Sequence, residues 1–85
     1  MQLTLGHRAH SELLATFQRK GLPKNRHSEY LSALLVAATL HWQAQLNRNK
    51  TPNLFVYDVS ENNRYFLVFH YIRHPHKADC WILDR

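Results

Sequence analysis

Three apolar runs separated by two polar breaks dominate the second half of the chain, residues 53–85. The runs are rich in aromatic and β-branched residues, and the breaks at residues 60–63 and 74–77 contain Ser, Glu, Asn, Pro and His. Strand-forming runs that alternate with short turn-forming clusters are typical of an antiparallel meander. This stretch therefore predicts three consecutive antiparallel strands.

Side chains alternate between the two faces of such a sheet, so loops with an even number of residues would fix which residues share a face. One predicted face carries Phe55, Tyr57, Val59, Phe66, Val68, His70, Ile72, Trp81 and Leu83. The opposite face carries Leu54, Val56, Asp58, Tyr65, Leu67, Phe69, Tyr71, Cys80 and Ile82. A bulge or an odd-length loop would change this assignment. Neither predicted face is polar, so both need a cover, and the sequence leaves open which face the helices cover.

Two helices are predicted before the meander. Over residues 7–20, apolar residues recur every three or four positions, as in an amphipathic helix, and Gly21 is a natural stop. A second helix runs from Ser28 to Leu46 or Asn47 and is apolar almost all round, which is typical of a helix buried on every side. Residues 1–5 alternate apolar and polar, which fits a short edge strand or an ordered arm.

These elements predict an α+β domain of two layers, with two helices packed on a three-stranded antiparallel meander and residues 1–5 as the candidate fourth, edge strand. The chain has 85 residues, which is enough for a single domain over residues 1–85. It has no run of about 18 apolar residues and no signal-peptide pattern, and Cys80 is its one cysteine. We therefore expect a cytoplasmic protein that is not inserted in a membrane.

The apolar surface exceeds what two short helices can cover, which predicts a homodimer or an obligate protein partner. The predicted interface is the second sheet face, or alternatively the outer side of the second helix. On the sheet, the residues assigned to this interface are Tyr65, Leu67, Phe69, Tyr71 and Ile82. In the alternative, a monomer shields the surplus with long side chains, residues 1–5 and the connection at residues 47–52.

The chain is basic, with eleven Lys and Arg against six Asp and Glu and a formal net charge of +5. Such a balance favours nucleic acid, an acidic protein surface or an anionic membrane as partner, or serves solubility alone. The basic residues cluster in three connections, two of which, the helix–helix loop and the second hairpin, would form one surface if they shared an end. The predicted contacts to DNA or RNA are Arg19, Lys20, Lys24, Arg26, Arg48, Lys50, Arg73, His74, His76 and Lys77.

The sequence gives only weak indications of a metal site or a catalytic site. His70, His74, His76 and Cys80 fall within eleven positions and are zinc-ligating residue types, but their spacing matches no standard zinc site. The carboxylates are scattered, and the chain has no Gly-rich phosphate loop. We therefore expect no cofactor, no metal and no catalytic residue, and a protein that binds rather than an enzyme.

Three functions remain open from the sequence. The first is a dimeric module that binds nucleic acid through phosphates, with little sequence readout. The second is a protein-interaction adaptor or small inhibitor that docks through an apolar sheet face. The third is a metal-independent ribonuclease that uses Tyr71, Arg73, His74, His76 and Lys77, a palette that small bacterial ribonuclease toxins also use, although no motif is shared.

Overall fold

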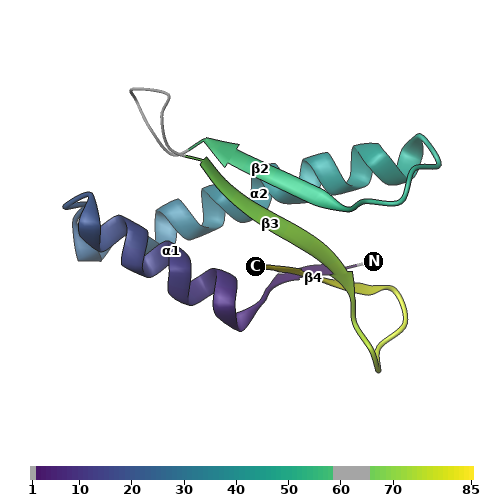
Figure 1. Ribbon diagram of the computed structural model, residues 1–85, viewed down its shortest axis with the longest axis horizontal. Coiled ribbons are helices and arrows are strands. Elements are labelled where there is room, and N and C mark those ends of the chain that lie inside the picture. The colour runs from purple at the N-terminus through teal and green to yellow at the C-terminus, as the bar shows by residue number, and fades with distance from the viewer. Residues whose placement is uncertain (1, 59–65) are drawn as a thin grey trace.

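Two layers, a pair of helices and a four-stranded sheet, make up the computed structural model, which describes residues 2–58 and 66–85 (Figure 1). The predicted α+β two-layer class is confirmed. The elements in chain order are β1 (Gln2–Leu5), α1 (His7–Arg19), the 3-10 turn η1 (Lys24–Arg26), α2 (His27–Asn47), β2 (Leu54–Asp58), β3 (Phe66–Arg73) and β4 (Cys80–Asp84).

The sheet is mixed, with the strand order β1-β4-β3-β2. The predicted meander is present, since β2 pairs antiparallel with β3 and β3 pairs antiparallel with β4. The alternating residues at the start of the chain form the fourth strand, which pairs parallel with β4 along its whole length. The candidate edge strand is therefore present, and its parallel pairing makes the sheet mixed rather than wholly antiparallel.

The predicted assignment of residues to the two faces is wrong by one residue in β3. Phe55 lies opposite Phe69, and Tyr71 lies opposite Leu83, so odd-numbered residues of β2, β3 and β4 share one face. The cause is that an odd number of residues separates β3 from each of its neighbours. Asp58 pairs with Phe66, so seven positions lie between the paired ends of β2 and β3. His74 N–H donates to the Cys80 carbonyl at 2.9 Å, which leaves the five residues 75–79 in the loop. An odd-length loop reverses the face assignment of a strand.

The helices cover the face that carries the odd-numbered residues. Phe69 and Leu83 are fully buried there, and the indole rings of Trp42 and Trp81 meet edge to face with their centres 6.1 Å apart. The buried hydrophobic core is Leu3, Ala9, Leu13, Phe17, Leu34, Ala38, Trp42, Phe55, Leu67, Phe69, Tyr71, Trp81 and Leu83. This core uses one face of the sheet alone, and the even-numbered residues form an open face.

Helix α2 is buried along one stripe rather than on every side. Leu34, Ala38 and Trp42, spaced four residues apart, are its buried positions. On its outer side Val36 and Leu40 are 59% and 63% exposed. The all-round apolar sequence is therefore a poor guide to burial here, because α1 lies beside α2 and leaves the outer side uncovered (Figure 1). Among the described residues, no helix has the combination of length and apolar character that crossing a membrane requires.

Both helices end as their sequences indicate. Gly21 has φ of +72°, and the hydrogen bonds from Gly21 N–H to Gln18 O and from Leu22 N–H to Phe17 O form a Schellman motif. At the end of α2, Asn49 has φ of +57° and occupies the equivalent position. Asn is among the non-glycine residues that adopt this conformation most readily. The hydrogen bonds of these two turns satisfy the carbonyl groups of Phe17 and Gln18 in α1 and of Gln45 and Leu46 in α2.

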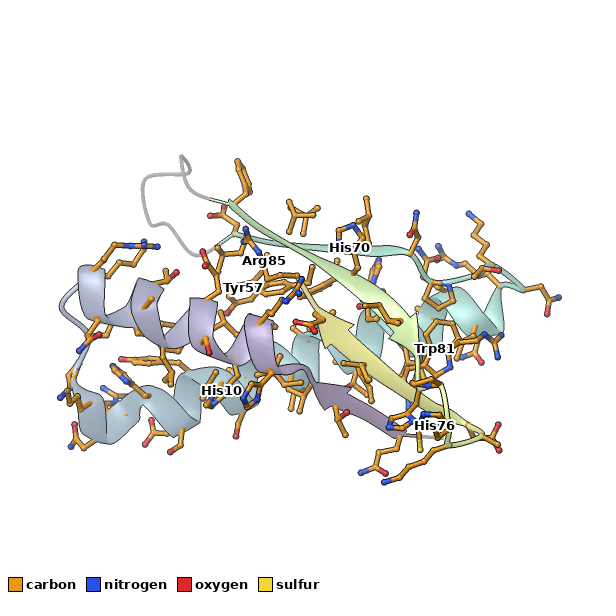
Figure 2. The ribbon with its side chains drawn as sticks, turned by 60° about the horizontal axis from the view of Figure 1, so that its bottom comes forward. His10, Tyr57, His70, His76, Trp81 and Arg85 are labelled. Carbon is orange, nitrogen blue, oxygen red and sulfur yellow. The ribbon has the colours of Figure 1, made fainter. Side chains whose placement is uncertain are left out.

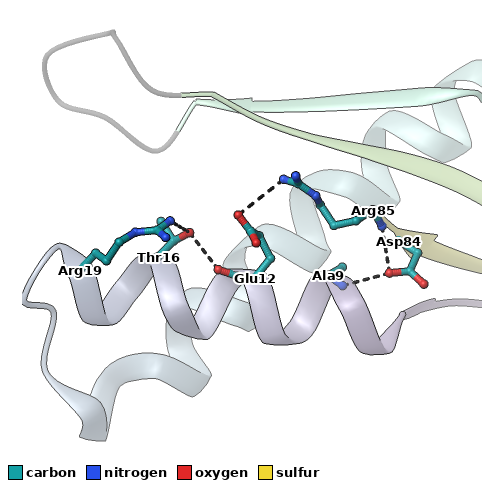
Figure 3. A network of polar contacts seen from close by, with 6 residues as sticks. All are labelled: Ala9, Glu12, Thr16, Arg19, Asp84 and Arg85. Carbon is teal, nitrogen blue, oxygen red and sulfur yellow. Dashed lines mark hydrogen bonds and ion pairs between the residues drawn. The ribbon is translucent and has the colours of Figure 1, made fainter.

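The first turns of α1 contact Asp84 and Arg85, which lie far from them in the sequence. The carboxylate of Asp84 accepts a hydrogen bond from Ala9 N–H at 2.9 Å, and Arg85 lies 3.7 Å from the carboxylate of Glu12 (Figure 3). Gly6, the residue before α1, contributes no side-chain cap. A methyl group at Gly6 would lie 2.5 Å from Cγ of Asp84, so glycine makes room for this distant cap.

Candidate nucleic-acid interface

The connection between β3 and β4 is organised by the imidazole ring of His74. Its Nδ1 accepts hydrogen bonds from the backbone N–H groups of His76 and Lys77, both at 3.1 Å. Since Nδ1 is the acceptor, the neutral ring carries its hydrogen on Nε2. His74 therefore acts as a turn-forming residue, in the manner of an Asn or Asp side chain in a turn. Its ring remains able to donate a hydrogen bond from Nε2.

A polar hollow of about 280 Å³ lies within this connection. Its lining residues are Arg73, His74, Pro75, His76, Lys77, Ala78, Asp79, Cys80 and Trp81. Three features keep it open: Pro75, the left-handed backbone of Asp79 at φ +61°, and the His74 turn. The hollow brings together guanidinium, ammonium and imidazole groups that donate hydrogen bonds to anions.

Arg73 borders this hollow from the end of β3. Its guanidinium carbon lies 4.7 Å from the centre of the Trp81 ring, which is a cation–π distance. Trp81 is buried, so Arg73 covers it from the solvent side. The planar guanidinium retains N–H groups at its edge, which suit bidentate contact with a phosphate.

The ten predicted phosphate contacts fall at two ends of the molecule (Figure 1). The loop between α1 and η1 lies at one end, whereas the α2–β2 and β3–β4 connections lie toward the other. The hydrogen bond from Tyr71 N–H to Asn53 O, at 2.9 Å, places the α2–β2 connection beside the end of β3. We name the residues of this second end, Arg48, Lys50, Arg73, His74, His76 and Lys77, the hairpin end. The α1–α2 loop and the second hairpin therefore do not share an end, which answers a question that the sequence left open.

The remaining four predicted residues lie around the α1–α2 loop. Arg26 pairs with Glu29 at 3.3 Å, and Arg19 donates to Thr16 Oγ1 at 3.2 Å. Lys20 and Lys24 are exposed at the end of α1 and in η1. Figure 2 shows the α1–α2 loop at the left of the molecule and the β3–β4 connection, with His76, at the lower right.

The residues predicted as a dimer interface are mostly inside the molecule. Leu67, Phe69 and Tyr71 are 2%, 0% and 6% exposed and pack under the helices. Ile82 is half-buried and lies on the open face, and Tyr65 lies outside the described residues. Their placement follows from the reversed face assignment, because a shift of one residue exchanges the two faces. The apolar surplus that motivated the prediction lies on the even-numbered side instead.

Tyr71, also considered for ribonuclease chemistry, has a structural role. Its hydroxyl donates to the Ala38 carbonyl at 2.8 Å and lies 3.0 Å from Nδ1 of His41. Since the single hydroxyl hydrogen is used on Ala38, His41 donates from Nδ1. Burial raises the pKa of Tyr71 above its ordinary value. A buried, neutral phenol that ties α2 to β3 is not available for proton transfer at the surface.

Metal-ligating residues do not converge in the described part of the chain. Within residues 2–58 and 66–85, no three His, Cys, Asp or Glu side chains are arranged to hold a metal ion. His70 and Cys80, predicted on opposite faces, both occupy even-numbered positions on the open face. His74 and His76 are the adjacent imidazole pair, with ring centres 6.3 Å apart.

The roles of two residues were not predicted from the sequence. Asp84, one of the scattered carboxylates, caps α1, and only the pairing of β1 with β4 brings it there. The turn-forming role of His74 had a local signal in the sequence. A side-chain acceptor that lies two or three residues before unpaired backbone N–H groups is a common turn pattern.

The chain matches no protein-family model, and no curated protein and no solved structure is significantly similar to it.

Proposed function

We propose that the protein binds nucleic acid through its phosphate groups at the hairpin end. The observation that supports this most directly is the polar hollow of the β3–β4 connection, which Arg73, His74, His76 and Lys77 line together. A phosphate oxygen accepts hydrogen bonds, and these four side chains include three strong donor types. Contacts of this kind fix the position of a backbone without reading the bases.

Neighbouring groups strengthen the proposal. Arg48 and Lys50 are exposed in the α2–β2 connection, which runs beside the end of β3. Asp79 is the one acidic residue among those lining the hollow. The hairpin end therefore combines several positive groups with a single carboxylate, which favours a polyanion over a small neutral ligand.

Salt-dependent binding tests this proposal. The experiment measures fluorescence anisotropy of labelled single-stranded RNA and duplex DNA of unrelated sequences, at 50 to 200 mM salt. We expect binding that weakens steeply with salt and is similar for all sequences. The variant His76→Ala/Lys77→Ala should weaken binding roughly tenfold and lower the salt slope by about 1. Both turn hydrogen bonds survive in this variant, because they use the backbone N–H groups of residues 76 and 77.

The matched control is His10→Ala/Lys24→Ala, which removes the same residue types from exposed positions away from the hairpin end. It should bind like the unchanged protein. Equal weakening by both double variants would show that net charge alone drives binding and would overturn the assignment to the hairpin end. Absence of binding at 50 mM salt would overturn the function itself.

One observation favours the protein-interaction alternative. The outer side of α2 carries an apolar hollow of about 310 Å³ lined by Ser32, Leu35, Val36, Thr39 and Leu40. A groove of this kind suits an apolar side chain of another protein. If nucleic acid does not bind, this groove becomes the first place to mutate in a search for a protein partner.

The ribonuclease alternative is addressed in the same assay. Its candidate base His74 has Nδ1 occupied by two backbone donors, and Tyr71 is buried. We expect RNA to stay intact in EDTA after prolonged incubation with the protein. Cleavage that disappears in His74→Asn would instead assign the hollow to ribonuclease chemistry.

A further inference from the structure

The open face of the sheet exposes a continuous apolar surface. Val56 lies directly opposite Val68, and Ile72 lies opposite Ile82, so the apolar side chains of β2, β3 and β4 are neighbours. The large hydrophobic residues exposed on this face are Leu54 at 43%, Val56 at 56%, Phe66 at 55%, Val68 at 41% and Ile72 at 43%. Antiparallel strands with one face in water normally carry polar residues there. The open face departs from that rule over three adjacent strands.

The same face is nearly free of charge. By strand alternation, no Lys or Arg occupies an open-face position of the described strands. His70 lies within the apolar surface, and Asp58 and Asp84 lie where β2 and β4 end. Among the described residues, Lys and Arg thus lie in the connections, in the helices and at the ends of strands. Packing the described open-face positions against another surface would bury no uncompensated cation.

We propose that this open face binds the open face of a second copy of the chain, forming a symmetric dimer of two stacked sheets. A two-fold interface uses the same patch on both subunits, so the patch must be compatible with itself. An apolar patch without Lys or Arg meets this condition even in a chain of net charge +5. A patch that recognised nucleic acid or an acidic protein would instead need cations on it.

The area of the face suits a weak, concentration-dependent dimer. The five exposed side chains present roughly 400 to 450 Å² per copy, within the range that monomers expose as one patch. Two copies face to face would bury about 900 Å² from these side chains, which is the size of weak, transient interfaces. Twisted sheets stack with their strands about 30° apart and their planes about 10 Å apart. The dimer would therefore have four layers, with the helices outside.

Analytical ultracentrifugation over a range of concentrations tests the proposal. We expect a dimer at concentrations of tens of micromolar that dissociates on dilution. Val68→Lys places a cation near the centre of the face, where two copies would bring like charges together. This variant should sediment as a monomer while keeping the far-ultraviolet circular dichroism of the unchanged protein.

Val36→Lys is the matched control, since it makes the same change at an exposed apolar position on the outer side of α2. It should leave the dimer intact. If Val68→Lys does not fold, Val56→Lys on the edge strand β2 tests the same face. A strictly monomeric unchanged protein, or a dimer that only Val36→Lys dissociates, would overturn the proposal. Neither outcome bears on phosphate binding, because the hairpin end and the open face share no proposed contact residue.

Discussion

The two faces of the sheet are built from the same strands but meet different surroundings. Phe69 and Phe66 illustrate the contrast, since both are aromatic residues of β3 and yet one is 0% and the other 55% exposed. The covered face gains its stability from packing against α1 and α2, which is complete within one chain. The open face has equally apolar residues and no cover from its own chain. The difference teaches that burial here is decided by register rather than by composition.

The largest expected effect compares these two phenylalanines. Phe69→Ala should lower the free energy of unfolding by about 3 to 5 kcal/mol, because it leaves a cavity in the core. Phe66→Ala should change it by less than about 1 kcal/mol in the monomer, where the side chain is already half in water. Urea denaturation at a concentration where the chain is monomeric provides the measurement. Similar losses in both variants would refute the assignment of faces.

A second prediction concerns Asp84, an open-face position that nevertheless serves α1. Gly6→Ala should destabilise the protein by about 1 to 3 kcal/mol, because the added methyl group collides with the Asp84 carboxylate. Asp84→Ala alone should cost about 1 kcal/mol through loss of the helix cap. Thermal denaturation of both variants and the double variant gives the coupling between them.

The double variant Gly6→Ala/Asp84→Ala is the informative control. Because removing the carboxylate also removes the collision, its loss should be smaller than the sum of the single losses. Strictly additive losses would mean that residues 6 and 84 do not meet.

The smallest expected effect belongs to the polar contact inside the covered face. Tyr71→Phe should cost about 1 kcal/mol at neutral pH, since it removes the hydrogen bond to the Ala38 carbonyl. Burial raises the pKa of Tyr71 in the folded state, whereas the unfolded chain has the ordinary value of about 10. The stabilisation is therefore complete below about pH 10 and is lost as the pH rises further, because the unfolded state ionises first.

Urea denaturation of the unchanged protein and of Tyr71→Phe at pH 8, 10 and 11 measures this dependence. We expect the stability of Tyr71→Phe to decline less over that range than the stability of the unchanged protein. Parallel declines would show that Tyr71 ionises equally easily in the folded and unfolded states.

Much of the fold could be predicted from the sequence, and the main error of that prediction, the face assignment of β3, is instructive. The helices, the meander and the edge strand followed from periodicity and from turn residues. The assignment of residues to the two faces could not be predicted in this way, because a sequence does not state whether a connection has an even or an odd number of residues. A stronger criterion was present: grouping the odd-numbered strand residues gives a face that is apolar except for Arg73 at the end of β3, and leaves Asp58, His70 and Asp84 together on the other. That pattern alone favours the observed register.

The site was less predictable because its parts come from separate connections. The residues at the ends of β3 and β4 had to be close, since they form a hairpin. The position of the α1–α2 loop depends instead on where β1 joins the sheet, and β1 pairs with the strand most distant from it in sequence. Local sequence patterns contain no information on the pairing of strands that are as distant in sequence as β1 and β4. The basic residues were therefore recognised individually, whereas their division between two ends required the structure.

The central position of β4 has a consequence for how the molecule forms. Among the strands, β4 comes last in the chain and yet lies between β1 and β3. During synthesis on a ribosome, β1 and α1 emerge first but have neither a neighbouring strand nor the Asp84 cap until β4 follows. Contacts between such remote segments slow folding, because a long loop must close before they form. In nascent chains arrested before Cys80, α1 should therefore not dock on the sheet, even after long incubation.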